Sequence, residues 1–251
     1  MKISLRRWLV PALCALATGL SARVEYEIYA GPHFNYTHLK FNNPSDLEGY
    51  QGGVTTGLTA QCGRYFSNLN FEGTWNAGRI TGVPCQRSSL AEYFVELQVG
   101  RGCLFCSSWF IPYVGFGWDR FENRQDPGQA NLLYQYDKLF IPVGFYLMRE
   151  FCGWEGALQF EFRPDVYDNL RLVGLNLDPH WGYAFRVQLP FRRDFILPWW
   201  KCRHMTFRLV PFFDYNRFGR VRVLNSVEAP LVIPRLERWS AGLRVLVGTI
   251  F

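Results

Sequence analysis

The feature that most constrains the fold is an alternation of apolar and polar side chains that recurs along the chain from about residue 24 onward. The last stretch shows it clearly: Leu243, Val245, Val247 and Phe251 share one parity, and Arg244 lies on the other. Successive side chains of a β-strand point to opposite faces. Each such stretch is therefore predicted to be a strand with one apolar face and one polar face.

Ten stretches of roughly ten residues carry this pattern. They are residues 24–36, 50–62, 65–77, 90–100, 109–118, 134–147, 154–163, 181–189, 205–216 and 239–251. The fifth stretch is apolar on both parities, so the pattern leaves its facing open. The longest apolar run, from Trp109 to Trp118, is interrupted by Pro112, Gly115 and Gly117. A helical membrane span needs about 20 apolar residues, so the pattern predicts an all-β chain.

The connections between these stretches alternate in length. Those after the second, fourth and sixth stretches are short, and those after the first, third, fifth, seventh and ninth are longer and rich in turn-forming residues. Short turns at one rim and long loops at the other are typical of outer-membrane barrels. A soluble β-sandwich also alternates, but it does not account for the two loop lengths. We therefore expect a closed antiparallel transmembrane β-barrel of about ten strands.

The first residues predict the compartment. Lys2, Arg6 and Arg7 precede an apolar stretch and then small residues up to Ala22, which is typical of a secretory signal peptide. We expect residues 1–22 to be cleaved and residues 23–251 to form the barrel. Removing those three basic residues from 27 Lys and Arg leaves 24 against 21 Asp and Glu. This balance does not favour nucleic-acid binding.

The final stretch resembles the C-terminal signal of bacterial outer-membrane proteins, in which alternating apolar residues end on a terminal phenylalanine. The residues that carry the resemblance are Leu243, Val245, Val247 and Phe251. It implies that the chain is an integral outer-membrane barrel in contact with membrane lipid. It also implies that the barrel-assembly machinery reads this last strand.

Cysteine is the unusual residue type, with six of the seven cysteines lying after the predicted signal peptide. Five of them lie at or beside the short connections: Cys62, Cys103, Cys106, Cys152 and Cys202. The oxidising periplasm permits disulfides. Cysteine-bearing envelope barrels are similar in this one trait to the envelope proteins of the Chlamydiae, which implies disulfide-linked envelope partners. Unlinked or locally paired thiols remain the alternative.

The polar parity of the strands predicts a charged lumen. Ten strands spaced ~4.8 Å apart and tilted ~40° give a radius of ~10 Å, so charged side chains nearly fill the centre. Two functions remain open: a structural scaffold plugged by salt bridges, and a narrow gated pore. The predicted lumen charges are Glu25, Glu27, Glu72, Glu92, Glu96, Glu155, Glu161, Lys138, Arg163, Arg186, Arg208 and Arg244.

Other functions have weaker support in the sequence. Asp178 and His180 have the Asp-x-His spacing of half an omptin protease site, but the chain contains no Asp-x-Asp pair for the other half. No serine hydrolase grouping is recognisable, and Cys103-x-x-Cys106 lacks a partner pair for zinc. We expect no enzyme activity, no cofactor and no metal. A surface adhesin that uses the long loops is the alternative function.

Two connections are unusual. Residues 190–203 are long for a short-rim turn, and we expect Arg192 and Arg193 to face lipid phosphate there, with the apolar residues at the membrane interface or in the lumen mouth. Residues 216–238 form a basic segment, which we expect to be an exposed long loop.

Overall fold

The structure is a computed structural model. It describes residues 24–40, 46–80, 87–105, 107–125, 134–172, 175–177, 181–196, 204–219, 221–224, 230–233 and 236–251. The predicted signal peptide lies outside these ranges and stays a prediction. Among the described residues, no helix has the length and apolar character needed to cross a bilayer.

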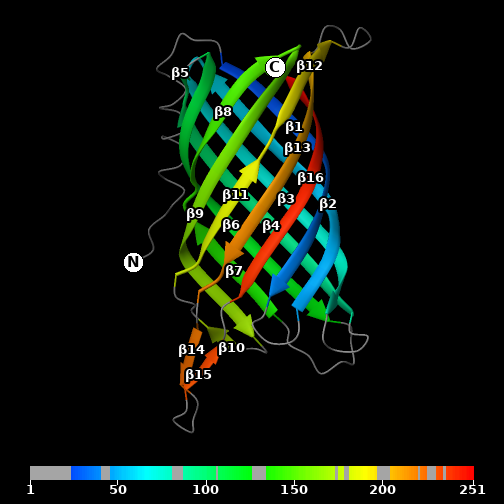
Figure 1. The fold of residues 1–251 in the computed structure, drawn as a ribbon, viewed down its shortest axis with the longest axis vertical. Helices are drawn as coiled ribbons and strands as arrows, with labels where there is room; N and C mark the ends of the chain where they lie inside the picture. Colours follow the sequence, from blue (N-terminus) through cyan, green and yellow to red (C-terminus); the bar gives the residue numbers. More distant parts are fainter. Residues whose placement is uncertain are drawn as a thin grey trace.

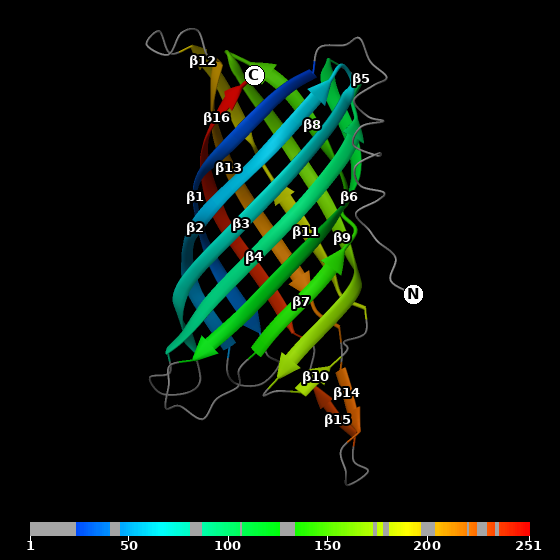
Figure 2. The same ribbon diagram turned by 180° about the vertical axis from the view of Figure 1, so that it is seen from behind.

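The described elements are all strands. They are β1 (Val24–Lys40), β2 (Asp46–Cys62), β3 (Tyr65–Ile80), β4 (Arg87–Arg101), β5 (Cys103–Phe105), β6 (Ser108–Gln125), β7 (Tyr134–Phe140), β8 (Val143–Phe151), β9 (Trp154–Leu172), β10 (Leu175–Leu177), β11 (Tyr183–Gln188), β12 (Phe191–Ile196), β13 (His204–Arg217), β14 (Val221–Leu224), β15 (Pro230–Ile233) and β16 (Glu237–Ile250). All but β14 and β15 form one antiparallel sheet that closes on itself (Figures 1 and 2).

The closed sheet contains ten barrel strands, as predicted. The three-residue strands β5 and β10 pair only with β6 and β9 and are not counted among them, and two of the ten are interrupted. β7 and β8 form one barrel strand separated by Ile141 and Pro142, and β11 and β12 form another separated by Leu189 and Pro190. Proline has no N–H to donate to a strand ladder, so the regular pairing stops at each of these two sites.

The first and last strands close the barrel. β1 pairs with β16 from Glu27 opposite Ile250 to Lys40 opposite Glu237. At the rim, the Phe251 N–H donates to the Tyr26 carbonyl at 2.9 Å, and the Tyr26 N–H donates to the Phe251 carbonyl at 3.4 Å. Closure leaves no sheet edge that would expose unpaired peptide groups to lipid. The predicted barrel is therefore confirmed, and the β-sandwich is excluded.

Most strands are longer than the sequence pattern predicted, and three regions show why. β9 continues past Arg163 to Leu172, because it pairs with β7 beyond the expected end. The segment 190–203, expected to be a turn, begins with β12, which pairs with β13. The segment 216–238, expected to be a loop, gives its ends to β13 and β16 and contains the small hairpin β14–β15. The prediction ended the strands at turn-forming residues, but backbone pairing with the neighbouring strands continues through these positions.

The short connections after β2 and β8 are tight turns. Gly63, Cys152 and Gly153 adopt positive φ angles of 59°, 49° and 76°. Two-residue hairpins often need positive φ because that twist matches the twist of the strands they join. The described barrel begins and ends at this same rim, and β14–β15 projects beyond the opposite rim (Figures 1 and 2). We call the two ends the short-turn rim and the long-loop rim.

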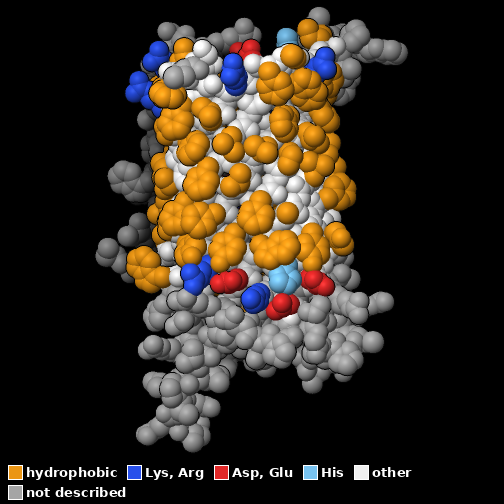
Figure 3. All heavy atoms as spheres, in the orientation of Figure 1, with side chains coloured by type: hydrophobic (Ala, Val, Ile, Leu, Met, Phe, Trp, Pro, Cys, Tyr) orange, Lys and Arg blue, Asp and Glu red, His pale blue; other side chains and the backbone are white. Residues whose placement is uncertain are grey.

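The facing of the fifth barrel strand, which the sequence left open, is defined in β6. Tyr113, Asp119 and Phe121 are buried in the lumen, and Val114 and Phe116 are exposed on the outside. The apolar parity of the strands covers the outer wall, where Figure 3 shows hydrophobic side chains over most of the barrel and charged ones near its two ends. An outer apolar band of this kind suits a lipid bilayer.

We predict that the contact of Phe251 with β1 is needed for insertion. Deleting Phe251, or replacing it with aspartate, is expected to leave precursor processing intact and to lower the amount of folded protein in the outer membrane. The measurement is quantitative blotting of membrane fractions with heat-modifiability as the test of folding. Phe105→Asp is the matched control, because Phe105 is an exposed phenylalanine at the same rim. Wild-type insertion of both Phe251 variants would exclude an assembly role for this residue.

Candidate functional site in the barrel lumen

Most of the predicted lumen charges are buried inside the barrel. Eight of the twelve have no more than 9% of their surface exposed: Glu27, Glu72, Glu96, Glu161, Lys138, Arg163, Arg186 and Arg244. Glu92, Glu155 and Arg208 also face inward but keep more exposure. Glu25 is different: it has the inward parity of β1, but it is exposed at the short-turn rim. Glu25 lies one inward position beyond the buried Glu27, toward the end of the barrel, where water surrounds its side chain.

Arg163 on β9 is the centre of the ion-pair network. Its Nη1 lies 3.0 Å from Asp214, its Nε lies 3.5 Å from Glu96, and it also pairs with Glu161 on its own strand. Its side chain is only 1% exposed. The guanidinium carbon also lies 4.8 Å from the centre of the Phe94 ring. One arginine therefore ties β4, β9 and β13 together across the lumen.

A second group is built around Glu72 on β3. Arg186 from β11 and Arg244 from β16 approach its two carboxylate oxygens at 3.2 and 2.9 Å. Arg186 also lies 2.8 Å from Asp214, which links this group to Arg163. His33 packs at the edge of the group, 3.7 Å from Glu72. Arg186 has two carboxylate neighbours, and Arg244 pairs with Glu72 and donates to the Gln188 amide oxygen at 2.8 Å, which offsets the cost of burying these charges.

A third group lies closer to the long-loop rim. Arg238 pairs with Glu92 at 2.9 Å and with Asp119 at 3.1 Å. Lys138 donates to Asn216 at 2.6 Å and lies 3.5 Å from Asp165. Ion pairs in this half therefore span the lumen from β4 and β6 to β16.

The sequence analysis missed several members of the network. Arg238 was assigned to a loop, so its inward position at the start of β16 is a correction. Asp119 lies on the strand whose facing the sequence left open. Asp214 lies on the polar parity of β13, so the alternation pattern was sufficient to predict it as a lumen charge. Arg192 was expected to face lipid phosphate, but it turns toward the lumen and lies 3.7 Å from Glu27, because β12 continues the barrel strand.

Aromatic rings fill the space between the charged groups. Phe94 and Phe140 stack with ring centres 5.6 Å apart, and Tyr136 meets Phe218 edge-on at 4.3 Å. Phe121 lies under the Arg238 guanidinium at 5.0 Å. We call this set of rings and ion pairs the central plug. It comprises Phe94, Phe121, Phe140, Phe212, Phe218, Tyr136, Lys138, Arg163, Arg186, Arg238, Arg244, Glu72, Glu92, Glu96, Glu161, Asp119, Asp165 and Asp214.

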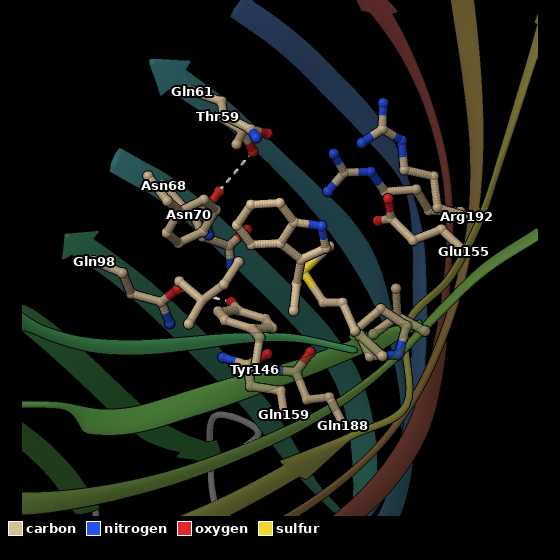
Figure 4. A pocket seen from close by; sticks show the side chains of 18 of the residues that line it. Thr59, Gln61, Asn68, Asn70, Gln98, Tyr146, Glu155, Gln159, Gln188 and Arg192 are labelled. Atoms are coloured by element: carbon tan, nitrogen blue, oxygen red, sulfur yellow. Dashed lines mark hydrogen bonds between the residues drawn. The ribbon is translucent and has the colours of Figure 1, made fainter. Parts of the chain in front are cut away.

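The other half of the lumen is hollow. A cavity of about 350 Å³ is lined at its mouth by Gly63, Arg64, Gly102 and Arg149 of the short-turn rim, and at its floor by residues of the central plug. We call it the inner cup. Its wall mixes apolar side chains such as Ile111, Met148 and Leu246 with amides and hydroxyls, which are Thr59, Gln61, Asn68, Asn70, Gln98, Gln159 and Gln188 (Figure 4).

Charges in the inner cup are balanced locally. Glu27 receives Arg208 and, at 3.7 Å, Arg192. Glu155 lies opposite Arg192 in the strand pairing and beside it in the cup (Figure 4). Tyr146 donates to Gln98 at 2.8 Å, and Thr59 donates to Asn68 at 3.2 Å. The cup therefore presents hydrogen-bond donors and acceptors, with ion pairs on its wall and Arg64, Arg149 and Glu150 at its mouth.

The remaining predicted site residues are the Asp–His pair of omptin-like spacing and the cysteines. Asp178 and His180 of the omptin-like spacing lie outside the described residues. In the described part of the chain, no cluster of three His, Cys, Asp or Glu side chains is arranged to bind a metal ion. Cys62, Cys103 and Cys152 lie at the short-turn rim and form no disulfide with one another. Cys106 and Cys202 lie outside the described residues.

Comparisons with known proteins give the fold. The outer membrane protease OmpT of Escherichia coli superposes with a TM-score of 0.53 at 9% identity, over 93% of this chain and 99% of that one. The fold is that of bacterial outer-membrane β-barrels. The NalP autotransporter translocator domain of Neisseria meningitidis matches at TM-score 0.45 and 9% identity, over 97% and 93% of the two chains. No family model matches the chain, and no curated protein matches it in sequence.

Proposed function

We propose that the protein is an integral outer-membrane barrel that acts as a closed structural scaffold and does not serve as a diffusion pore. The observation that carries this proposal is the central plug, in which Arg163 and Arg238 are buried across the lumen among rings and carboxylates. An open pore of this size would keep such groups hydrated. A catalytic role is not part of the proposal.

The apolar outer wall supports placement in the outer membrane, with the short-turn rim toward the periplasm. We also propose that β16 is the strand read by the barrel-assembly machinery. Its outward residues Leu243, Val245 and Val247 lie on the lipid-facing parity next to β1.

The experiment that tests closure is planar-bilayer recording of the refolded wild-type protein. We expect no steady conductance, because the buried ion pairs and rings of the central plug occupy the lumen between the inner cup and the long-loop rim. Refolding is checked by heat-modifiability on the same sample. A large and steady wild-type conductance would contradict the scaffold and favour the narrow pore.

A second candidate function is a surface adhesin. The observation that favours it is the β14–β15 hairpin, which projects beyond the long-loop rim (Figures 1 and 2). Deleting residues 221–233 and measuring attachment to host cells distinguishes the two functions. An adhesin is expected to lose attachment, whereas a scaffold is expected to insert normally and to show no change in attachment.

We further propose that thiols at the short-turn rim link this barrel to neighbouring envelope proteins. Cys103 and Cys152 are exposed there, where an oxidising periplasm reaches them. Non-reducing electrophoresis of native envelopes is expected to show a slower species that collapses with reductant. Replacing Cys62, Cys103, Cys106, Cys152 and Cys202 with serine is expected to abolish it. A single monomer band, with every thiol alkylated before reduction, would contradict the cross-link.

A further inference from the structure

We propose that the inner cup binds a short neutral glycan of one or two sugar units that enters from the short-turn rim. This goes beyond closure of the barrel and concerns the half of the lumen that the central plug leaves empty. The cavity of about 350 Å³ is within the usual range for small-molecule sites, roughly 300–1,000 Å³. Its floor is closed by the plug, so a ligand binds and leaves through one mouth.

The lining determines the chemical class of the ligand. An amide side chain offers both donors and acceptors, and a hydroxyl does the same. Gln61 and Asn68 lie on the neighbouring strands β2 and β3, and Gln159 on β9 lies across the cup from them (Figure 4). A ligand that both donates and accepts in several directions fits this lining. Asn68 already accepts from Thr59 and Gln159 already donates to Tyr113, but a hydrocarbon would desolvate the remaining donors and acceptors of these amides, which is costly.

The charges in the cup argue against a small anion. Arg208 and Arg192 already share Glu27, and Arg244 is held by Glu72 at 2.9 Å. Glu155 at the mouth and Glu96 at the floor would repel an anion further. These three arginines are therefore available as hydrogen-bond donors to a neutral group, while their charge is balanced within the protein. Arg64 and Arg149 share the mouth of the cup with Glu150, and the comparison with phosphate below tests whether they attract an anion.

Aromatic side chains supply the remaining element of a sugar site. Trp109 lines the cup and is 44% exposed, and Tyr146 packs against Phe66 with ring centres 5.5 Å apart. A flat aromatic surface suits the apolar face of a sugar ring, and nearby amides suit its hydroxyls. Few other neutral solutes combine many hydroxyls with a flat apolar face.

The test is isothermal titration calorimetry of the refolded protein in a sugar-free detergent. The probes are N,N′-diacetylchitobiose and maltose, with inorganic phosphate as the anionic comparison. We expect saturable binding of at least one disaccharide. Trp109→Ala and Asn68→Ala are each expected to weaken it by about tenfold, because stacking or a hydrogen-bonding amide is lost. Heat-modifiability confirms that each variant is folded.

Trp75→Ala is the matched control, because Trp75 lies on the outer wall and is 49% exposed. It is expected to bind like wild type. Three outcomes would each overturn the proposal: no saturable binding of either disaccharide, binding that persists in both cup variants, or saturable binding of phosphate alone. Calorimetry in detergent is independent of conductance in a bilayer, so this proposal and the closed scaffold can fail separately.

Discussion

Replacing Arg163 with alanine is expected to lower the free energy of unfolding by about 3–5 kcal/mol. The reason is that the substitution leaves Glu96, Glu161 and Asp214 facing one another without the guanidinium that they share. Removing one partner of a buried ion pair costs more than the pair itself contributes, since the remaining charge has lost its water. The decrease in the free energy of unfolding is smaller to the extent that water from the inner cup hydrates Glu96.

The measurement is urea unfolding of the barrel in lipid vesicles, followed by tryptophan fluorescence. Arg101→Ala is the matched control: Arg101 is an exposed arginine at the short-turn rim whose guanidinium lies over the Tyr65 ring. We expect a change within about 0.5 kcal/mol for this variant, as for most surface substitutions. An equal effect in both variants would show that the burial of Arg163 has no special role.

A variant that also neutralises two of the partner carboxylates separates lost charge from lost packing. Arg163→Met combined with Glu96→Gln and Asp214→Asn removes the cation together with two of its three carboxylate partners. Replacing a buried ionic group by neutral residues of similar volume is often tolerated. We therefore expect this triple variant to recover most of the stability that Arg163→Ala loses. Failure to recover it would mean that the packing of Arg163 on Phe94 and Phe140 is the larger contribution.

Most of the fold could be predicted from the sequence because a barrel strand in lipid must alternate. Residues such as Ile28 and Leu58 face lipid and Glu72 faces the lumen, so parity alone assigns each side chain to a face. The strand ends could not be predicted in the same way. Asn169 and Pro190 belong to turn-forming residue types, yet β9 runs through Asn169, and the barrel strand made of β11 and β12 is only interrupted at Pro190. Pairing with the neighbouring strand decides where a strand ends, and the local sequence pattern carries no information about that pairing.

The ion-pair partners within the lumen could not be predicted from the sequence for a related reason. Parity places Arg186 and Glu72 on inner faces, but they are 114 residues apart, and their meeting depends on the stagger of the strands around the barrel. The division of the lumen into a plug and a cup has the same origin. Large rings on β4, β6 and β7 meet at one level, and amides on β2, β3 and β9 meet at another. A list of inward residues does not show this layering.

The layering leads to a prediction about conductance. Phe94 and Phe140 stack in the central plug, with Arg163 over both rings at 4.8 and 5.3 Å from their centres. Replacing both phenylalanines with alanine removes the rings that hold Arg163 and leaves its carboxylate partners in place. We expect water to enter this space and connect the inner cup with the long-loop rim. Planar-bilayer recording should then show discrete conductance steps that the wild type lacks.

Two controls define the site of closure. Phe71→Ala with Phe116→Ala removes two phenylalanines that are exposed on the outer wall, and it is expected to stay silent. Arg208→Ala enlarges the inner cup beneath the plug, so it is also expected to stay silent, although it leaves Glu27 with one partner fewer. Steps from Arg208→Ala equal to those from the double phenylalanine variant would place the barrier in the cup. Silence from the double variant, with folding confirmed by heat-modifiability, would show that the ion pairs alone close the lumen.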